Sequence, residues 1–356
     1  MASSTDELCK LQGRLAVVDD DQEPSSSWSI LFVVRRPPSR LVRETGLLAG
    51  PALLVHGGAG TFERLRGAEA RARLEDGLRT ALAAGWHELQ RGGTALQAAV
   101  EAVACMEDTG LFNAGRGSTV TSVGTIEADA GVMDGGTGAA GAVCAASWPA
   151  NAVRAALAVA VLGRSCEQEA PAEGGGRPGG GSPSWQPLLL AGAGADRVAR
   201  AAGLAPREYG TALAPAHGER PGPTGPGTVG AVALDMAGHV AAATSTGGRA
   251  GQPPGRIGDS PIIGAGTWAD DRTAAISATG AGEAFILAGF AHRADWAVRS
   301  GLSLGDALAA AMDEVGDRGG TGGAIALAPS GHYATIFDTA AMARGRRDAT
   351  GTVVAV

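Results

Sequence analysis

The amino-acid sequence predicts an α+β fold, in the form of a four-layer α-β-β-α sandwich. The order of its segments carries this prediction: strand, helix pair, strands and helix come first, and hairpin, strand, helix pair and hairpin follow. Two stacked sheets with helices outside satisfy that order, because each sheet covers the apolar face of the other. Small aliphatic residues must form the core, since 45% of the chain is hydrophobic and only 4% aromatic.

The first half of the chain begins with a buried strand and a pair of helices. The apolar run PALLVHGG predicts a short buried strand that glycine closes. Leucines spaced four apart from Leu74, followed by Trp86, give a helix over 68–91 one apolar face. A second helix begins after Thr94, where Gln97 completes a capping-box pattern. The other elements predicted for this half are strands and turns over 117–146 and helices over 151–163 and about 194–203.

Two segments of the second half share the frame G-A-[VI]-A-L-x-x-x-G-H-x-A. They are 230–246 and 323–339, and each is typical of a β-hairpin with a glycine turn. The sequence leaves two explanations open: the segments are related, or they are two ordinary hairpins built from the same few small residues. Between them we expect a strand over 273–279 and helices over 283–299 and 303–315.

We expect one domain that begins near residue 49. Residues 1–48 combine polar, acidic and turn-rich stretches with a six-residue apolar run, and we expect this extension to be poorly ordered. The run is too short to span a bilayer, and it follows acidic residues, which argues against a signal peptide. A Gly/Pro/Ser-rich insert over about 167–187 predicts a mobile surface loop, and a second breaker-rich stretch, 214–227, predicts a linker.

Charge and residue usage argue against several classes of function. A net charge of −7 with scattered arginines does not suit a nucleic-acid-binding surface. The four cysteines are widely spaced, which favours a reducing compartment and a cytoplasmic location. The six histidines form no close pair, so no metal site is expected. One G-x-G-x-x-G pattern, from Gly136 to Gly141, lacks a preceding apolar strand and a following helix, which argues against dinucleotide binding.

Four threonines of the second half stand at strand ends or in glycine-flanked turns. They are Thr228, Thr244, Thr246 and Thr279. Where adjacent strands end level, their hydroxyls converge on one point, and the glycines after them let a ligand approach the backbone. The backbone N–H groups of Gly280 and Ala281, at a helix N-terminus, are expected to face a developing oxyanion there.

Threonine needs a neighbouring base to act as a nucleophile, and no histidine stands out for that role. A freed α-amino group on the same residue meets the need, since it titrates at about pH 7.7–8.0. The linker PGPTGPG offers a glycine carbonyl in an accessible turn, which the Thr228 hydroxyl can attack. We therefore expect the Gly227–Thr228 bond to be an autoproteolysis bond.

The segment PGRIGDSPIIGAG places a cation and an anion three residues apart. Arg256 can hold a carboxylate with its planar guanidinium, and Asp259 can hold an ammonium group. Together they fit the α-carboxylate and α-amino groups of an amino acid. A surface turn is the ordinary explanation of such a pair, but the glycines on both sides favour a binding site.

Several blocks of the sequence resemble the plant-type asparaginase/isoaspartyl aminopeptidase family of N-terminal nucleophile (Ntn) hydrolases. They are VHGGAG, FNAGRGSTVTSVGTIEADAGVMDG, GTVGAVALD, ATSTGG, GRIGDSPIIGAGTWAD and TGAGEAFI, between about Leu53 and Met342. The resemblance implies the four-layer sandwich of Ntn hydrolases and a precursor that cleaves itself into an alpha-chain part, 49–227, and a beta-chain part, 228–356. It also implies hydrolysis of L-asparagine and of β-aspartyl (isoaspartyl) dipeptides through a β-aspartyl ester on Thr228.

The same resemblance implies a role for each matching residue. Thr228 is the nucleophile with its own amine as base, Thr246 supports its hydroxyl, and Thr279 and Gly280 form the oxyanion site. The residues expected to contact substrate are Arg256, Ile257, Gly258, Asp259, Thr279, Gly280, Ala281, Gly282 and Asn113. The stretch that starts at His56 is expected to be a loop near the active site.

No cofactor is expected, apart from a structural monovalent cation near the alpha chain. The implied partners are L-asparagine, β-aspartyl dipeptides and a second αβ unit in a homodimer, with no nucleic acid and no membrane.

A glycosylasparaginase-like amidase on the same fold is a second hypothesis. Gly227 before the nucleophile and TSTGG in place of TSTNG favour the first hypothesis, a β-aspartyl hydrolase. A third hypothesis is an inactive member that acts as a binding protein. The intact threonines argue against it, and so does the intact pair of Arg256 and Asp259, which we call the clamp. The departures ADA at 128–130 and RAGQP after TSTGG leave substrate preference open.

Overall fold

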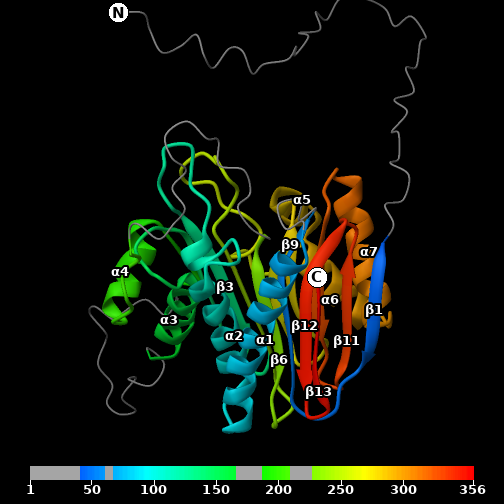
Figure 1. Ribbon diagram of the computed structural model, residues 1–356. Coiled ribbons are helices and arrows are strands. Elements are labelled where there is room, and N and C mark those ends of the chain that lie inside the picture. The colour runs from blue at the N-terminus through cyan, green and yellow to red at the C-terminus, as the bar shows by residue number, and fades with distance from the viewer. Residues whose placement is uncertain (1–40, 61–66, 166–186, 209–226) are drawn as a thin grey trace, which may run out of the picture. The chain divides into compact units, whose positions relative to one another are not determined.

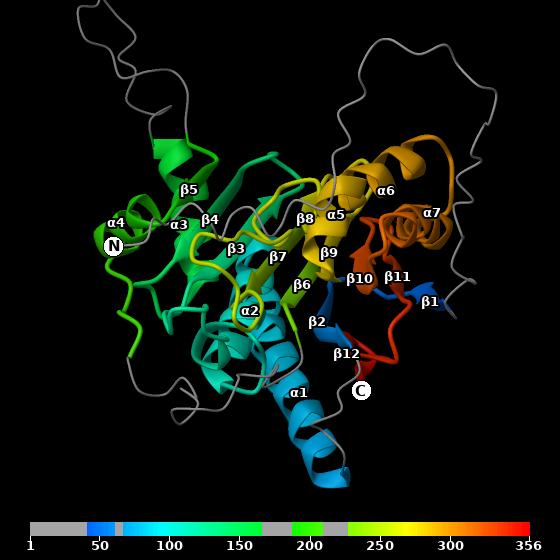
Figure 2. The same cartoon turned by 90° about the horizontal axis from the view of Figure 1, so that it is seen from above.

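Two β-sheets pack face to face, and helices cover the outer side of each (Figures 1 and 2). The architecture is seen in a computed structural model that describes residues 41–60, 67–165, 187–208 and 227–356. The predicted four-layer α-β-β-α sandwich is confirmed for these residues.

The helices and strands of the described residues follow one another along the chain. The helices are α1 (Ala68–Gln90), α2 (Ala95–Thr109), α3 (Ala152–Ser165), α4 (Ala193–Ala201), α5 (Gly282–Ala288), α6 (Phe290–Arg299) and α7 (Leu304–Asp317), with a short 3-10 helix, η3, at Gly115–Gly117. The strands are β1 (Val42–Leu47), β2 (Ala52–Gly60), β3 (Ala128–Asp134), β4 (Ala140–Ala146), β5 (Leu189–Ala191), β6 (Val229–Leu234), β7 (Val240–Thr246), β8 (Thr267–Ala269), β9 (Ala275–Gly280), β10 (Gly322–Leu327), β11 (His332–Phe337), β12 (Ala341–Asp348) and β13 (Gly351–Ala355).

The larger sheet has the strand order β13-β12-β2-β6-β7-β3-β4-β5, and the smaller has the order β1-β11-β10-β9-β8. Neighbouring strands are antiparallel, except that β4 and β5 run parallel. Helices α1 to α4 lie against the larger sheet, and α5 to α7 lie on the side of the smaller one (Figure 2). The central strands β6 and β7 therefore have helices behind them and the smaller sheet in front.

Small and branched aliphatic residues form the interior, as the composition predicts. Leu54, Val232 and Ile325 are buried between the two sheets. On the helix side, a Cβ atom on Gly141 would lie 2.3 Å from Ala156 O, so α3 packs directly on the β4 backbone. The last glycine of the G-x-G-x-x-G pattern therefore serves helix packing rather than phosphate binding.

Most predicted elements are present, and one helix is divided. The capping box is confirmed: Gln97 N donates to Thr94 Oγ1 at 3.2 Å, and Thr94 N donates to Gln97 Oε1 at 2.9 Å. The helix predicted over 283–299 is two helices, because Gly289 adopts the left-handed conformation between α5 and α6, with φ 57°. The two predicted hairpins are β6–β7 and β10–β11, which lie in different sheets.

The N-terminal boundary differs from the prediction. Residues 1–48 were expected to be poorly ordered, but β1 is a regular strand that pairs with β11 along its length. Its partner lies at the other end of the chain, so no local pattern shows it. Residues 1–40, 166–186 and 209–226, which include most of the predicted insert and linker, lie outside the described residues. Within the described ranges, no helix is both long and apolar enough to cross a membrane.

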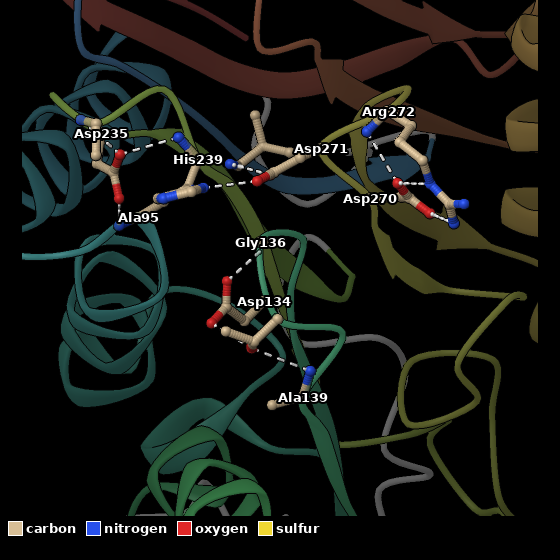
Figure 3. A network of polar contacts seen from close by, with 12 residues as sticks. Ala95, Asp134, Gly136, Ala139, Asp235, His239, Asp270, Asp271 and Arg272 are labelled. Atoms are coloured by element: carbon tan, nitrogen blue, oxygen red, sulfur yellow. Dashed lines mark hydrogen bonds and ion pairs between the residues drawn. The ribbon is translucent and has the colours of Figure 1, made fainter.

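A group of carboxylates closes the end of the larger sheet where β6 turns into β7 (Figure 3). Asp235 accepts hydrogen bonds from the N–H groups of His239, at 3.0 Å, and of Ala95 at the start of α2, also at 3.0 Å. Asp271 Oδ2 lies 2.6 Å from His239 Nδ1. Asp271 therefore ties the turn after β8 to the β6–β7 hairpin at the end away from Thr228, whereas Asp270 binds Arg272 and Arg299.

Candidate active site

Two threonine hydroxyls meet where β6 begins and β7 ends. Val229 pairs with Ser245 across these strands, so the residues next to them, Thr228 and Thr246, face each other. Thr228 Oγ1 donates a hydrogen bond to Thr246 Oγ1 at 3.1 Å. Thr246 Oγ1 also accepts one from Gly248 N at 3.1 Å. Because both threonines are buried, at 8% and 4% exposed, the protein rather than water sets the direction of the Thr228 hydroxyl.

The residue before Thr228 packs against two other parts of the predicted site. A Cβ atom on Gly227 would lie 3.5 Å from Thr279 Oγ1, so the Thr279 hydroxyl is close to the Gly227–Thr228 peptide. A Cβ atom on Gly58, which has φ +104°, would lie 2.3 Å from Gly227 N. Only glycine fits at position 58. Thr279 lies near the end of β9, so the smaller sheet places this hydroxyl beside the start of β6 in the larger sheet.

Two groups that were predicted to contribute to this site, a threonine hydroxyl and a backbone N–H group, make other contacts instead. Thr244 Oγ1 lies 2.7 Å from Ser277 Oγ and is fully buried between the sheets, so three of the four threonines converge and Thr244 does not. The N–H group of Ala281 donates to Thr321 O at 2.9 Å and is not free for an oxyanion. That prediction is wrong because a segment much later in the chain supplies the carbonyl. The role of Gly280 stays a prediction.

Arg256 and Asp259 converge on one point, as predicted. A Cβ atom on Gly282 would lie 2.8 Å from Asp259 Oδ1 and 3.2 Å from Arg256 Nη2. The side chain that Gly282 lacks therefore leaves room between the two charges. Glu283 Oε1 lies 2.9 Å from Arg256 Nε and from Nη2, which holds the guanidinium in place. This geometry suits a small ligand that carries both an anionic and a cationic group.

Asp259 is a buried carboxylate with an unpaired oxygen. Its side chain is 3% exposed, and Oδ2 has no hydrogen-bond partner within the described part of the chain. Burial raises the pKa of Asp259 to about 7, against the opposing effects of a backbone hydrogen bond and of Arg256. A buried carboxylate is destabilising unless it is paired. The site therefore favours a ligand with an ammonium group.

Asp129 holds the loop that carries the clamp, although the sequence reasoning did not select it. Asp129 Oδ2 accepts a hydrogen bond from Gly258 N at 3.0 Å, and Oδ1 accepts one from Ala145 N at 2.8 Å. Burial raises the pKa of Asp129 to about 6, and the two backbone hydrogen bonds act in the opposite direction. The available signal was an acid among the apolar residues of β3, well before the second acid, Asp134, at the end of that strand. Ile257 and Gly258 owe their main-chain position to this carboxylate.

Asn113 braces the turn that follows β7. Its Nδ2 donates to Gly248 O at 2.6 Å, and its Oδ1 accepts from Thr119 N at 3.0 Å. Its main-chain oxygen accepts from Gly247 N at 2.8 Å. Because the N–H group of Gly248 is bonded to Thr246, Asn113 acts on that hydroxyl through the turn. Direct contact of Asn113 with substrate stays a prediction.

His56 lies inside β2 rather than in the loop predicted for it. It is fully buried, and its Nε2 lies 3.0 Å from Ser277 Oγ. Burial lowers the pKa of His56 to about 3, while a hydrogen bond to the Thr228 main chain acts in the opposite direction. The imidazole is thus neutral and bonded to Ser277, so it is not placed as the base for the Thr228 hydroxyl. A freed α-amino group of Thr228 remains the expected base.

Comparison with known proteins decides the family. The family model described as asparaginase matches residues 49–165 and 188–355. The chain belongs to the asparaginase family. Relatives include a plant-type L-asparaginase of Pyrobaculum calidifontis, 41% identical over 314 residues that cover 82% of this chain and 95% of that protein. An isoaspartyl peptidase of Escherichia coli strain K12 is 38% identical over a stretch that covers 82% of this chain and 91% of that protein. An isoaspartyl peptidase/L-asparaginase of Danio rerio is 35% identical over 82% of this chain and 90% of its own.

The predicted site residues all lie within the ranges matched by the asparaginase family. Strand β1 lies before residue 49, so this member of the asparaginase family has an edge strand outside the matched range. Among the described residues, no group of three or more His, Cys, Asp or Glu side chains is arranged to hold a metal ion.

Proposed function

We propose that this member of the asparaginase family is a self-cleaving amidohydrolase. It converts L-asparagine to L-aspartate and ammonia, and it cleaves β-aspartyl dipeptides. The hydrogen bond from Thr228 to Thr246, beside Gly227, carries this proposal because it orients a buried hydroxyl at the predicted cleavage point. The names of the relatives, L-asparaginase and isoaspartyl peptidase, support the same two activities.

Self-cleavage exposes the nucleophile. The Thr228 hydroxyl oxygen attacks the carbonyl carbon of Gly227, the peptide C–N bond breaks, and the nitrogen takes up the proton. Water then hydrolyses the resulting ester, which releases the carboxylate of Gly227 and a free amino group on Thr228. The Thr279 hydroxyl, close to Gly227, can donate to the carbonyl oxygen as its charge develops.

Substrate hydrolysis reuses the same groups. The α-amino group of Thr228 takes the proton of the hydroxyl, whose oxygen attacks the side-chain amide carbon of asparagine. The tetrahedral intermediate collapses to a β-aspartyl ester, and ammonia, or the amine of a dipeptide, leaves with that proton. Water then hydrolyses the ester and releases aspartate. Thr246 keeps the attacking oxygen in line throughout, since its contact with Thr228 lies within one hairpin.

The clamp selects an amino acid with a free α-carboxylate and a free α-ammonium group. Arg256 can hold the carboxylate through its Nη atoms, and the unpaired Oδ2 of Asp259 can take the ammonium. The chemistry needs no group that the chain lacks, so we propose that catalysis requires no cofactor. The structural monovalent cation, the homodimer of αβ units and the cytoplasmic location stay predictions.

Mass measurement of the purified full-length chain tests the proposal. After incubation we expect two chains, the second of which begins at Thr228, together with ammonia release from L-asparagine and cleavage of a β-aspartyl dipeptide. Thr228→Ala is expected to remain one chain and to release no ammonia. A wild-type protein that stays uncleaved and inactive contradicts the proposal. Faster hydrolysis of N-glycosylated asparagine than of asparagine supports the glycosylasparaginase-like alternative instead.

A further inference from the structure

Four buried polar side chains and one main-chain carbonyl form a continuous chain of contacts between the two sheets. The side chains are those of His56, Ser277, Thr244 and Thr267, and the carbonyl is that of Ser260; each residue is 0% exposed. None of them is the proposed nucleophile or a charged group of the clamp. Polar groups in an apolar interior destabilise the fold unless they are hydrogen-bonded. A hydrogen-bonded chain of such groups fixes the relative positions of the strands that carry them.

Short contacts join each member to the next. His56 Nε2 lies 3.0 Å from Ser277 Oγ, and Ser277 Oγ lies 2.7 Å from Thr244 Oγ1. Thr267 Oγ1 lies 2.7 Å from Thr244 Oγ1 and 2.8 Å from Ser260 O. The chain starts on β2 of the larger sheet, passes through strands of both sheets and ends in the loop that carries the clamp.

The His56 end of this chain supports the strand that carries the nucleophile. His56 pairs with Gly230 between β2 and β6, two residues after Thr228. A Cβ atom on Gly230 would lie 1.9 Å from Ser277 Oγ and 2.4 Å from His56 Nε2. The backbone of β6 at Gly230 therefore packs directly against the side chains of His56 and Ser277, and only glycine fits at position 230.

We propose that His56 is a positioning residue for Thr228. Its hydrogen bond to the Thr228 main chain and its contact with Ser277 support the first residues of β6 and so keep the Thr228 hydroxyl directed at Thr246. His56 touches neither the reacting atoms nor the clamp, so it acts on the rate of attack rather than on substrate binding. This inference rests on the proposed function, because it assigns a role within the same site.

Paired substitutions at position 56 test the inference. His56→Gln keeps a polar atom near the position of Nε2, whereas His56→Leu removes it at similar volume. For L-asparagine and fully cleaved enzyme, with the rate expressed per exposed Thr228 amino terminus, we expect His56→Leu to lower kcat about tenfold, as the loss of its hydrogen bonds predicts. We expect its KM to stay within about twofold of wild type, and His56→Gln to recover most of kcat.

Further variants separate positioning from loss of structure. Ser277→Ala removes the contact with His56 but leaves the hydrogen bond between His56 and the Thr228 main chain, so it is expected to lower kcat by less than His56→Leu does. The double variant is expected to lose little more than His56→Leu alone. Thr335→Val, at a buried threonine outside the polar chain, is the matched control and is expected to leave kcat unchanged.

Three outcomes overturn the inference. They are a His56→Leu enzyme with wild-type kcat, a loss that His56→Gln does not recover, and a parallel change of kcat and KM. If His56→Leu does not fold, Ser277→Ala carries the test, since it removes one oxygen only. A wild-type chain that neither cleaves itself nor hydrolyses asparagine contradicts the proposed function instead.

Discussion

Thr228 Oγ1 donates to Thr246 Oγ1 across 3.1 Å, at the point where β6 begins and β7 ends. The acceptor is itself fixed, because Thr246 Oγ1 also takes the N–H group of Gly248. Gly248 is in turn held by Asn113 through its carbonyl oxygen. One hairpin and the turn after it therefore fix the direction of the Thr228 hydroxyl, the proposed nucleophile, without any bound substrate.

Removal of the Thr246 hydroxyl should lower kcat without a matching change in KM. Thr246→Val keeps the shape of the side chain but leaves Thr228 without its acceptor, which predicts a loss of about tenfold in kcat. Thr246→Ser, which keeps the oxygen, is the matched control and should recover most of the rate. Steady-state ammonia release from L-asparagine by fully cleaved enzyme measures both. A Thr246→Val enzyme with wild-type kcat would show that the contact has no role in turnover.

Removal of the Arg256 guanidinium should weaken substrate binding. A charge-assisted hydrogen bond is worth roughly 1.5–3 kcal/mol, so Arg256→Gln should raise KM for asparagine by about ten- to a hundredfold. Arg249→Gln is the matched control, since Arg249 also contacts Glu283, at 3.8 Å, but stands outside the clamp. Initial rates over a range of asparagine concentrations give both KM values. Equal KM values for the two variants would remove Arg256 from the clamp.

The state of Asp259 should make substrate capture depend on pH. Its pKa is raised to about 7, so its carboxyl group is neutral below that pH and cannot pair with the substrate ammonium. We therefore expect kcat/KM for asparagine to fall as pH drops through about 7. The effect should be absent from kcat, because a bound ammonium keeps Asp259 ionised.

Succinamate provides the control for this pH dependence, since it is asparagine without the α-amino group. Its KM should lack the Asp259-dependent change, whereas the free α-amino group of Thr228 should affect both substrates alike. An identical pH profile of KM for the two compounds would show that Asp259 does not hold the ammonium.

Local signals in the sequence were sufficient to select two pairs of candidate residues that the structure then brings together. Thr228 and Thr246 stand at strand ends, and Arg256 and Asp259 lie in a glycine-rich turn, so their chemistry could be read from short segments. The α-β-β-α layers followed from the order of elements, which needs no knowledge of which strands pair. These are the parts of the molecule in which residues near in sequence act together.

The parts that were missed depend on partners far away in the chain. Asp129 acts through the N–H group of Gly258, and Ala281 loses its free N–H group to Thr321. Strand β1 exists because β11 offers it an edge. In each case tertiary packing decides which groups are paired, and the local pattern does not identify the distant partner.

Glu107 should make the folded chain less stable as pH rises. It is fully buried on α2, accepts a hydrogen bond from Ser245 Oγ at 2.5 Å, and has no hydrogen-bond partner at Oε2 within the described residues. Burial raises the pKa of Glu107 to about 7, while the bond from Ser245 acts in the opposite direction. Between the unfolded and folded pKa values the folded state holds a proton that the unfolded state has lost. Stability from this group is therefore complete below about pH 4.3 and is lost as pH rises through about 7.

Glu107→Gln should remove this contribution to the pH dependence. The test compares the double variant Thr228→Ala/Glu107→Gln with its uncleaved parent, Thr228→Ala. The free energy of unfolding of the double variant, minus that of the parent, should rise by on the order of 3 kcal/mol between pH 4.5 and pH 8. Glu101→Gln is the matched control, because Glu101 lies on the same helix but pairs with Arg154 at 2.7 Å near the surface. Denaturant unfolding at several pH values measures all three chains. A difference between Glu107→Gln and its parent that stays constant with pH would mean that Glu107 is ionised in the folded state throughout this range.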